Sequence, residues 1–170
     1  MNRSKNFVFV SFCLLAQGIR ASGIVKKFPG AVQPIINLLN RYNINIVQMA
    51  CPELHFDTFQ RRPCGKKKYD NPKNRSICRK LAEKEVDFIH LLQKNGCTVD
   101  VILGVEFSPS CAVSLLTAPP PKRYVKGEGI YIEELKKVLH SRRISLPIIG
   151  VQIYQMGNTL DELNNLLEKR

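Results

Sequence analysis

The sequence is poor in acidic residues and lacks long apolar runs. Its 170 residues include 14 Asp and Glu against 26 Lys and Arg, so the formal net charge is +12. Such a charge favours an anionic partner, for example a nucleic acid or a phosphorylated small molecule. Beyond the apolar stretch at residues 7–16, no segment approaches the roughly 18 to 20 apolar residues that span a bilayer. We therefore expect a cytoplasmic protein with no membrane partner.

The sequence also lacks a Cys-x-x-Cys pair, although it contains six cysteines. This excludes the usual signals of zinc ribbons and thioredoxin-like redox sites. A basic N-terminus followed by a short apolar run has the outline of a secretory signal peptide, which leaves open a secreted, disulfide-bonded protein. Cleavage near Ala21, however, would remove a predicted strand together with Cys13 and leave an odd number of cysteines.

Internal repeats and low-complexity tails are absent, and apolar strand-like segments alternate with amphipathic helix-like ones. Strands are predicted at 6–15, 44–49, 98–105 and 148–153, and helices at 32–42, from Ser76 to Gly96, at 132–140, and from a cap at Asn158 or Thr159 to Leu167. This alternation is typical of an open, mainly parallel sheet of about four to five strands with helices on both faces. We expect a single Rossmann-like α/β domain over residues 1–170, with a basic loop at 54–75 and a Pro/Gly-rich arm at 117–130.

Three of the predicted strands each deliver a cysteine at or just past their C-terminal end. These cysteines are Cys13, Cys51 and Cys111, the last of them in a Ser-Pro-Ser-Cys turn. Because neighbouring strands lie only about 4.8 Å apart, thiols at adjacent strand ends could converge on one point. Converging thiolates suit an iron–sulfur cluster or, less well, zinc. The alternative is that all three are buried packing residues, as free cysteines often are.

The residues around these cysteines form short motifs in a definite order. The motifs are Val10-Ser11-Phe12-Cys13-Leu14-Leu15, Cys51-Pro52-Glu53-Leu54 and Ser108-Pro109-Ser110-Cys111, with Arg61-Arg62-Pro63 and Lys68-Tyr69-Asp70 in the basic loop. Together they resemble the thiouracil desulfidase family over most of residues 6–115. The resemblance implies a compact α/β fold with a 4Fe–4S cluster ligated by Cys13, Cys51 and Cys111, whose fourth iron has no protein ligand. It also implies that this iron takes the sulfur of a thiolated pyrimidine while water supplies the oxygen of the product.

Two polar residues beside the cysteines are candidates for catalysis of that hydrolysis. Glu53, two residues after Cys51, is the carboxylate placed to act as general base. Ser108, three residues before Cys111, could position the water or relay a proton. The structural alternatives are a carboxylate that favours a helix N-terminus for Glu53 and a turn residue before proline for Ser108.

The basic loop is the candidate region for substrate binding. Arg61, Arg62 and Lys68 could hold a phosphate, and the Tyr69 ring could stack on a base. We therefore expect a thiolated nucleobase or nucleotide as substrate, and extend this expectation to thiolated tRNA. The main rival is a non-catalytic, basic α/β protein that binds RNA and uses its cysteines only for packing.

Overall fold

The computed structural model describes residues 3–170. Its central sheet has four parallel strands in the order β2-β1-β3-β6. The strand bounds are β1 Asn6–Ser11, β2 Asn45–Met49, β3 Thr98–Val105 and β6 Ile148–Val151. The predicted open, parallel α/β sheet is therefore confirmed.

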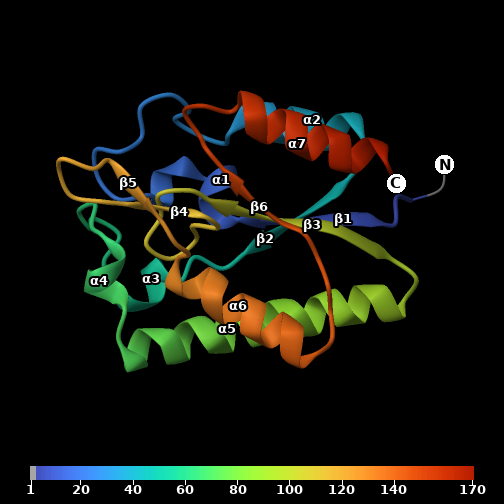
Figure 1. Cartoon of the computed structure of the whole chain (residues 1–170). Helices are drawn as coiled ribbons and strands as arrows, with labels where there is room; N and C mark the ends of the chain where they lie inside the picture. Colours follow the sequence, from blue (N-terminus) through green and yellow to red (C-terminus); the bar gives the residue numbers. More distant parts are fainter. Residues whose placement is uncertain (1–2) are drawn as a thin grey trace.

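Two helices cover each face of this sheet (Figure 1). On one face lie α2 (Gln33–Arg41) and α7 (Gly157–Glu168), which contact each other. On the other face lie α5 (Pro72–Lys94) and α6 (Ile130–Ser141), which pack along each other. No helix within residues 3–170 combines the length and the apolar character needed to cross a bilayer.

The central strands are buried on both sides, which explains their continuous apolar sequence. In β1 the consecutive residues Val8, Phe9 and Val10 are all fully buried, and in β3 so are residues 101–103. Successive side chains of a strand point to opposite faces, so both faces of the sheet are covered by core. Because β1 lies between β2 and β3, the N-terminal apolar run is the middle of the sheet.

The structure corrects two predicted boundaries near the candidate site. The first strand ends at Ser11 and not at Leu15, because residues 12–15 turn into the short helix α1 (Phe12–Leu15). Helix α5 begins at Pro72 and not at Ser76. The Asn71 side chain accepts a hydrogen bond from the Asn74 backbone N–H at 2.9 Å, and proline is favoured in the first helical turn.

Three further boundaries differ in the C-terminal half. Helix α6 begins at Ile130, two residues before the predicted start, and β6 ends at Val151. Helix α7 begins at Gly157 with no side-chain cap. The expected cap at Asn158 or Thr159 is therefore wrong, and the Thr159 hydroxyl instead accepts a hydrogen bond from the Gln152 backbone N–H.

The predicted loop regions contain short elements of their own. The basic loop region holds two single-turn helices, and a two-stranded antiparallel hairpin begins just before the Pro/Gly-rich arm and ends within it. These elements are η1 (Gln17–Ile19), α3 (Glu53–Phe56), α4 (Lys66–Tyr69), β4 (Leu115–Thr117) and β5 (Tyr124–Lys126). They gather at the end of the molecule beyond the carboxyl ends of β1 and β3 (Figure 1).

Candidate functional site

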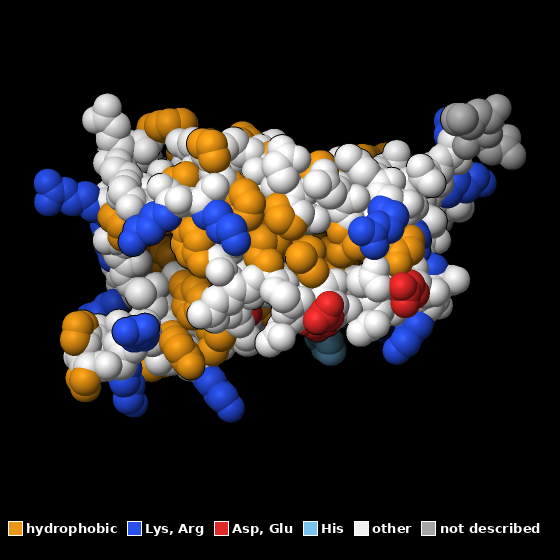
Figure 2. All heavy atoms as spheres, turned by 90° about the horizontal axis from the view of Figure 1, so that it is seen from above, with side chains coloured by type: hydrophobic (Ala, Val, Ile, Leu, Met, Phe, Trp, Pro, Cys, Tyr) orange, Lys and Arg blue, Asp and Glu red, His pale blue; other side chains and the backbone are white. Residues whose placement is uncertain are grey.

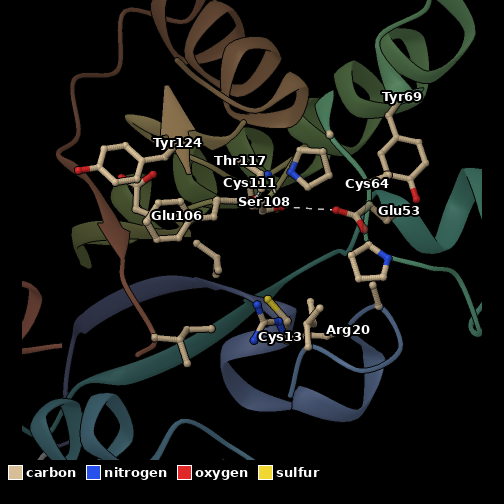
Figure 3. Close-up of a pocket in the computed structure, with 18 of the residues that line it drawn as sticks. Cys13, Arg20, Glu53, Cys64, Tyr69, Glu106, Ser108, Cys111, Thr117 and Tyr124 are labelled. Carbon is tan, nitrogen blue, oxygen red and sulfur yellow. Dashed lines mark hydrogen bonds between the residues drawn. The ribbon is translucent and has the colours of Figure 1, made fainter. Parts of the chain in front are cut away.

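The three predicted cysteines follow three neighbouring strands. Cys13 lies in α1 directly after β1, Cys51 follows β2, and Cys111 follows the turn after β3. The strands are parallel, and Ser11 at the end of β1 is in register with Met49 at the end of β2. All three cysteines line one pocket of about 790 Å³ at the carboxyl edge of the sheet. Figure 3 labels Cys13 and Cys111 in this pocket. This is the crevice where the strand order reverses around β1, a usual binding position in open α/β sheets.

The turn that carries Cys111 folds back tightly over β3. The Val105 backbone N–H donates to the Cys111 carbonyl oxygen at 2.9 Å. A Cβ atom on Gly104 would lie 2.5 Å from that same oxygen, and one on Gly129 would lie 2.2 Å from the Ser110 carbonyl oxygen. The turn therefore fits only because glycines lie beneath and beside it.

The N-terminus of α6 fixes the same turn from the other side. The backbone N–H groups of Ile130 and Tyr131 donate to the carbonyl oxygens of Pro109 and Ser110 at 3.1 and 3.0 Å. These are among the first N–H groups of the helix, which have no partner within it. The position of Cys111 is thus set by backbone contacts with both β3 and α6.

Glu53 and Ser108, the two predicted catalytic residues, lie together (Figure 3). The Ser108 hydroxyl accepts hydrogen bonds from the backbone N–H groups of Ser110 (3.2 Å) and Cys111 (3.0 Å). Its own proton is therefore free to point at Glu53 Oε1, 3.4 Å away. Glu53 Oε2 accepts a 2.8 Å hydrogen bond from Arg61 Nε within a largely buried ion pair. The carboxylate beside Cys51 is thereby linked to the turn of Cys111.

Burial raises the pKa of all three thiols. The pKa of Cys13 rises to about 12, although the nearby Arg20 opposes the shift. Burial, and secondarily the Glu53 charge, also raise the pKa of Cys51, while the pKa of Cys111 is raised well above its usual value by burial and the neighbouring thiols. Thiolates form in such surroundings when a bound cation stabilises them.

The three cysteines do not form a site for a single metal ion in the described chain. Within residues 3–170, no three His, Cys, Asp or Glu side chains form a group that could hold one metal ion. A zinc ion needs its ligands at about 2.0–2.3 Å from one point, whereas the cysteines of a 4Fe–4S cluster bind separate irons. The thiols available for the second requirement follow three neighbouring strands and line one pocket; Cys111 is buried, and Cys13 and Cys51 are partly buried.

The residues predicted for phosphate binding are placed in different ways. Arg61 is buried against Glu53, while Arg62 is exposed, and both line the pocket. Tyr69 also lines it, but its ring is buried and its hydroxyl donates to Asp57 at 2.6 Å. Lys68 pairs with the same carboxylate at 2.6 Å. Among the three cations of this set, Arg62 is the one without an ion pair in the described chain.

Several pocket residues were missed by the sequence analysis. Arg20 directly follows η1, Tyr154 follows β6, Phe107 lies in the turn after β3, and Tyr124 begins β5. Glu106 is buried, and its carboxylate accepts hydrogen bonds from the backbone of residues 113–115. Only Glu106 carried a sequence signal, because it directly follows the buried strand β3.

Comparison with known proteins supports the fold. No protein-family model matches the chain. An uncharacterised protein of Methanocaldococcus jannaschii is 26% identical over 147 residues, which is 86% of each chain. A solved structure, that of the 4Fe–4S-dependent thiouracil desulfidase TudS, is similar with a TM-score of 0.54 at 19% identity and covers 96% of this chain and 98% of that one. This chain therefore has a fold like that of the desulfidase.

Proposed function

We propose that this protein is an iron–sulfur-dependent desulfidase that converts the C=S group of a thiolated pyrimidine to C=O. The observation that most supports this proposal is that Cys13, Cys51 and Cys111, which follow three neighbouring strands, line one pocket. Glu53 and Ser108, whose side chains contact each other, line the same pocket. The desulfidase fold of the similar solved structure supports this proposal.

In this proposal the three cysteines hold a 4Fe–4S cluster whose fourth iron has no protein ligand. When bound, the cluster supplies a Lewis-acidic iron with an affinity for sulfur. The overall reaction is a hydrolysis, since water gives its oxygen to the ring carbon and the sulfur leaves as hydrogen sulfide. No electrons are gained or lost, so the reaction needs no further redox partner.

The protein's own contribution is to accept the proton of the attacking water. Glu53 Oε2 is occupied by Arg61, whereas Oε1 has only the long 3.4 Å contact with Ser108. Oε1 is therefore the oxygen that takes the proton, and the Ser108 hydroxyl orients the water or passes the proton on. Arg61 keeps the carboxylate in one orientation next to the cysteines.

The proposed substrate includes thiolated nucleotides and thiolated tRNA as well as the free base. Arg20, Arg62 and Arg123 line the pocket, and the chain carries a formal charge of +12. Figure 2 shows Lys and Arg side chains spread over the face above α2 and α7, with few acidic ones. Cations around a pocket favour a ligand that carries phosphate.

The test is sulfide release from thiouracil, thiouridine monophosphate and thiouridine-containing tRNA by anaerobically loaded protein. We expect release from at least one of these, and a loss of about 100-fold or more in Glu53→Gln, as general bases typically contribute that much. Glu162→Gln, on the outer surface of α7, serves as the matched control. Fully loaded protein that releases no sulfide from any of the three compounds would refute the proposal.

A further inference from the structure

An aromatic pair lines the candidate pocket without belonging to the hydrophobic core. Phe107 and Tyr124 both line the pocket, and they are 37% and 55% exposed. Their ring centroids lie 5.9 Å apart at an interplanar angle of 53°. Exposed aromatic rings that line a pocket are unusual for packing residues, because their apolar area remains accessible to water.

Phe107 also holds an unfavourable backbone conformation. Its φ is 67°, in the left-handed region, which a bulky residue rarely adopts. Such a conformation costs on the order of 1–3 kcal/mol and persists where its surroundings enforce it. Here the Phe107 N–H donates to the Leu115 carbonyl at 2.8 Å, and its own carbonyl accepts the Thr117 hydroxyl at 2.7 Å. The backbone strain at Phe107 is therefore not offset by full burial of its ring, since the residue stays 37% exposed.

The hairpin that enforces this conformation also places the second ring. Thr117 in β4 is the register partner of Tyr124 in β5, and the two strands are antiparallel. Thr117 therefore contacts both members of the aromatic pair: its hydroxyl binds the Phe107 carbonyl oxygen, and it lies opposite Tyr124 in the hairpin. Figure 3 shows Tyr124, Thr117 and Ser108 along the same side of the pocket, with Cys13 on the opposite side. Phe107 directly precedes Ser108, and both residues line the pocket.

We propose that Phe107 and Tyr124 form an aromatic wall that binds the planar ring of a thiolated heterocycle by stacking. This inference rests on the proposed function and adds the residues that recognise the ring itself. A conjugated pyrimidine ring presents a flat π-face, and base–aromatic stacking is worth about 1–3 kcal/mol per base. Because stacking requires a flat ring, the wall selects conjugated heterocycles over saturated ones that carry the same polar groups.

The test compares a flat ring with a puckered one in the loaded protein. The probes are uracil and 5,6-dihydrouracil, which carry the same carbonyl and N–H groups and have no sulfur to lose. We expect the wild type to bind uracil at least about fivefold more tightly, the lower end expected for one stacked base. Phe107→Asn removes the ring while tolerating the left-handed backbone, and should abolish this preference.

Control variants separate recognition from folding. Phe59→Leu removes a ring that is 60% exposed and does not line the pocket, so the preference for uracil should stay. Phe107→Asn should unfold at the same or a higher temperature than the wild type, because the backbone strain is relieved. Tyr124→Leu, on the exposed hairpin, provides a second variant that should weaken uracil binding even if Phe107→Asn does not fold.

The outcomes also separate this inference from the proposed function. Equal binding of the two probes by the wild type, or an unchanged preference in both wall variants, overturns the aromatic wall even if sulfide release is normal. A lower unfolding temperature in Phe107→Asn with unchanged probe affinities assigns the ring a structural role and overturns it too. Conversely, the loaded protein could prefer uracil over 5,6-dihydrouracil in a way that depends on Phe107, yet release no sulfide. That result supports the aromatic wall and refutes the desulfidase proposal.

Discussion

At the residue scale, the Ser108 hydroxyl connects the two halves of the candidate site. It accepts the backbone N–H groups of Ser110 and Cys111 and contacts Glu53, a residue 55 positions away in the sequence. A buried N–H that loses its acceptor costs about 1–3 kcal/mol. Ser108 therefore both holds the turn of Cys111 and contacts the proposed general base. Its substitution should affect stability and activity at the same time.

Ser108→Ala should reduce sulfide release and lower the free energy of unfolding by about 1–3 kcal/mol, because two N–H groups lose their acceptor. Ser110→Ala is the matched control, since the buried Ser110 hydroxyl has no hydrogen-bond partner within residues 3–170. Kinetic assays and chemical unfolding of both variants provide the measurement. Equal effects of the two substitutions would contradict the role assigned to Ser108.

The buried thiols predict how the stability of the unloaded protein depends on pH. The pKa of Cys13 is raised by burial to about 12, above its value in the unfolded chain. The neutral Cys13 thiol therefore contributes fully to the free energy of unfolding below about pH 8.5, the ordinary thiol pKa. This contribution is lost as the pH rises toward the pKa of Cys13 in the folded protein. Unfolding of metal-free protein between pH 8 and 10 should show a shallower decline in Cys13→Ala than in the wild type. If the free energy of unfolding declines equally with pH in the wild type and in Cys13→Ala, burial does not raise the pKa of Cys13.

At the scale of elements, the site depends on the contact between the turn of Cys111 and the start of α6. Gly129 directly precedes α6, and a Cβ atom there would lie 2.2 Å from the carbonyl group of Ser110. The backbone has no flexible side chain that could move aside. The turn and its cysteine must therefore shift when this glycine is replaced.

Gly129→Ala should lower both the iron content after loading and the unfolding temperature. Gly157→Ala, at the start of α7, is the matched control because nothing lies within 4 Å of its added Cβ. Iron analysis and thermal unfolding of the two variants check this expectation. Normal iron content in Gly129→Ala would show that the turn tolerates displacement.

The elements also show what the sequence could and could not predict. Continuous apolar runs such as 98–105 indicated the buried strands, and the parallel order followed from their alternation with helices. Helices of one turn, such as α3 and α4, have too few residues for a periodic pattern, so they were missed in the basic loop. Asn71 and Pro72 are a favoured helix cap and first-turn residue, and α5 begins at Pro72 instead of at the predicted Ser76.

The site was predictable where it depends on strand ends and unpredictable where it depends on loops. Cys13, Cys51 and Cys111 follow strands, so the topology alone brings them to one edge of the sheet. The pairing of Arg61 with Glu53, and the approach of Tyr124 to Phe107, depend on how loops fold over that edge. No local periodicity encodes such contacts, which only the folded chain reveals.

At the scale of the whole molecule, the candidate site depends on the position of β1 between β2 and β3. This order places three cysteine-bearing connections around one pocket, beyond the end of the sheet. It also makes the N-terminal apolar run an integral part of the fold. A different order of strands would have separated the thiols and left them as isolated packing residues.

The most direct test of this account is the amount of iron and acid-labile sulfide per chain after strictly anaerobic reconstitution. We expect about four of each in the wild type and a large loss in Cys111→Ser, as for a 4Fe–4S cluster on three thiolates. Cys97→Ser, a cysteine outside the pocket, should keep the full amount. Well-folded wild-type protein that binds no iron would contradict the central claim.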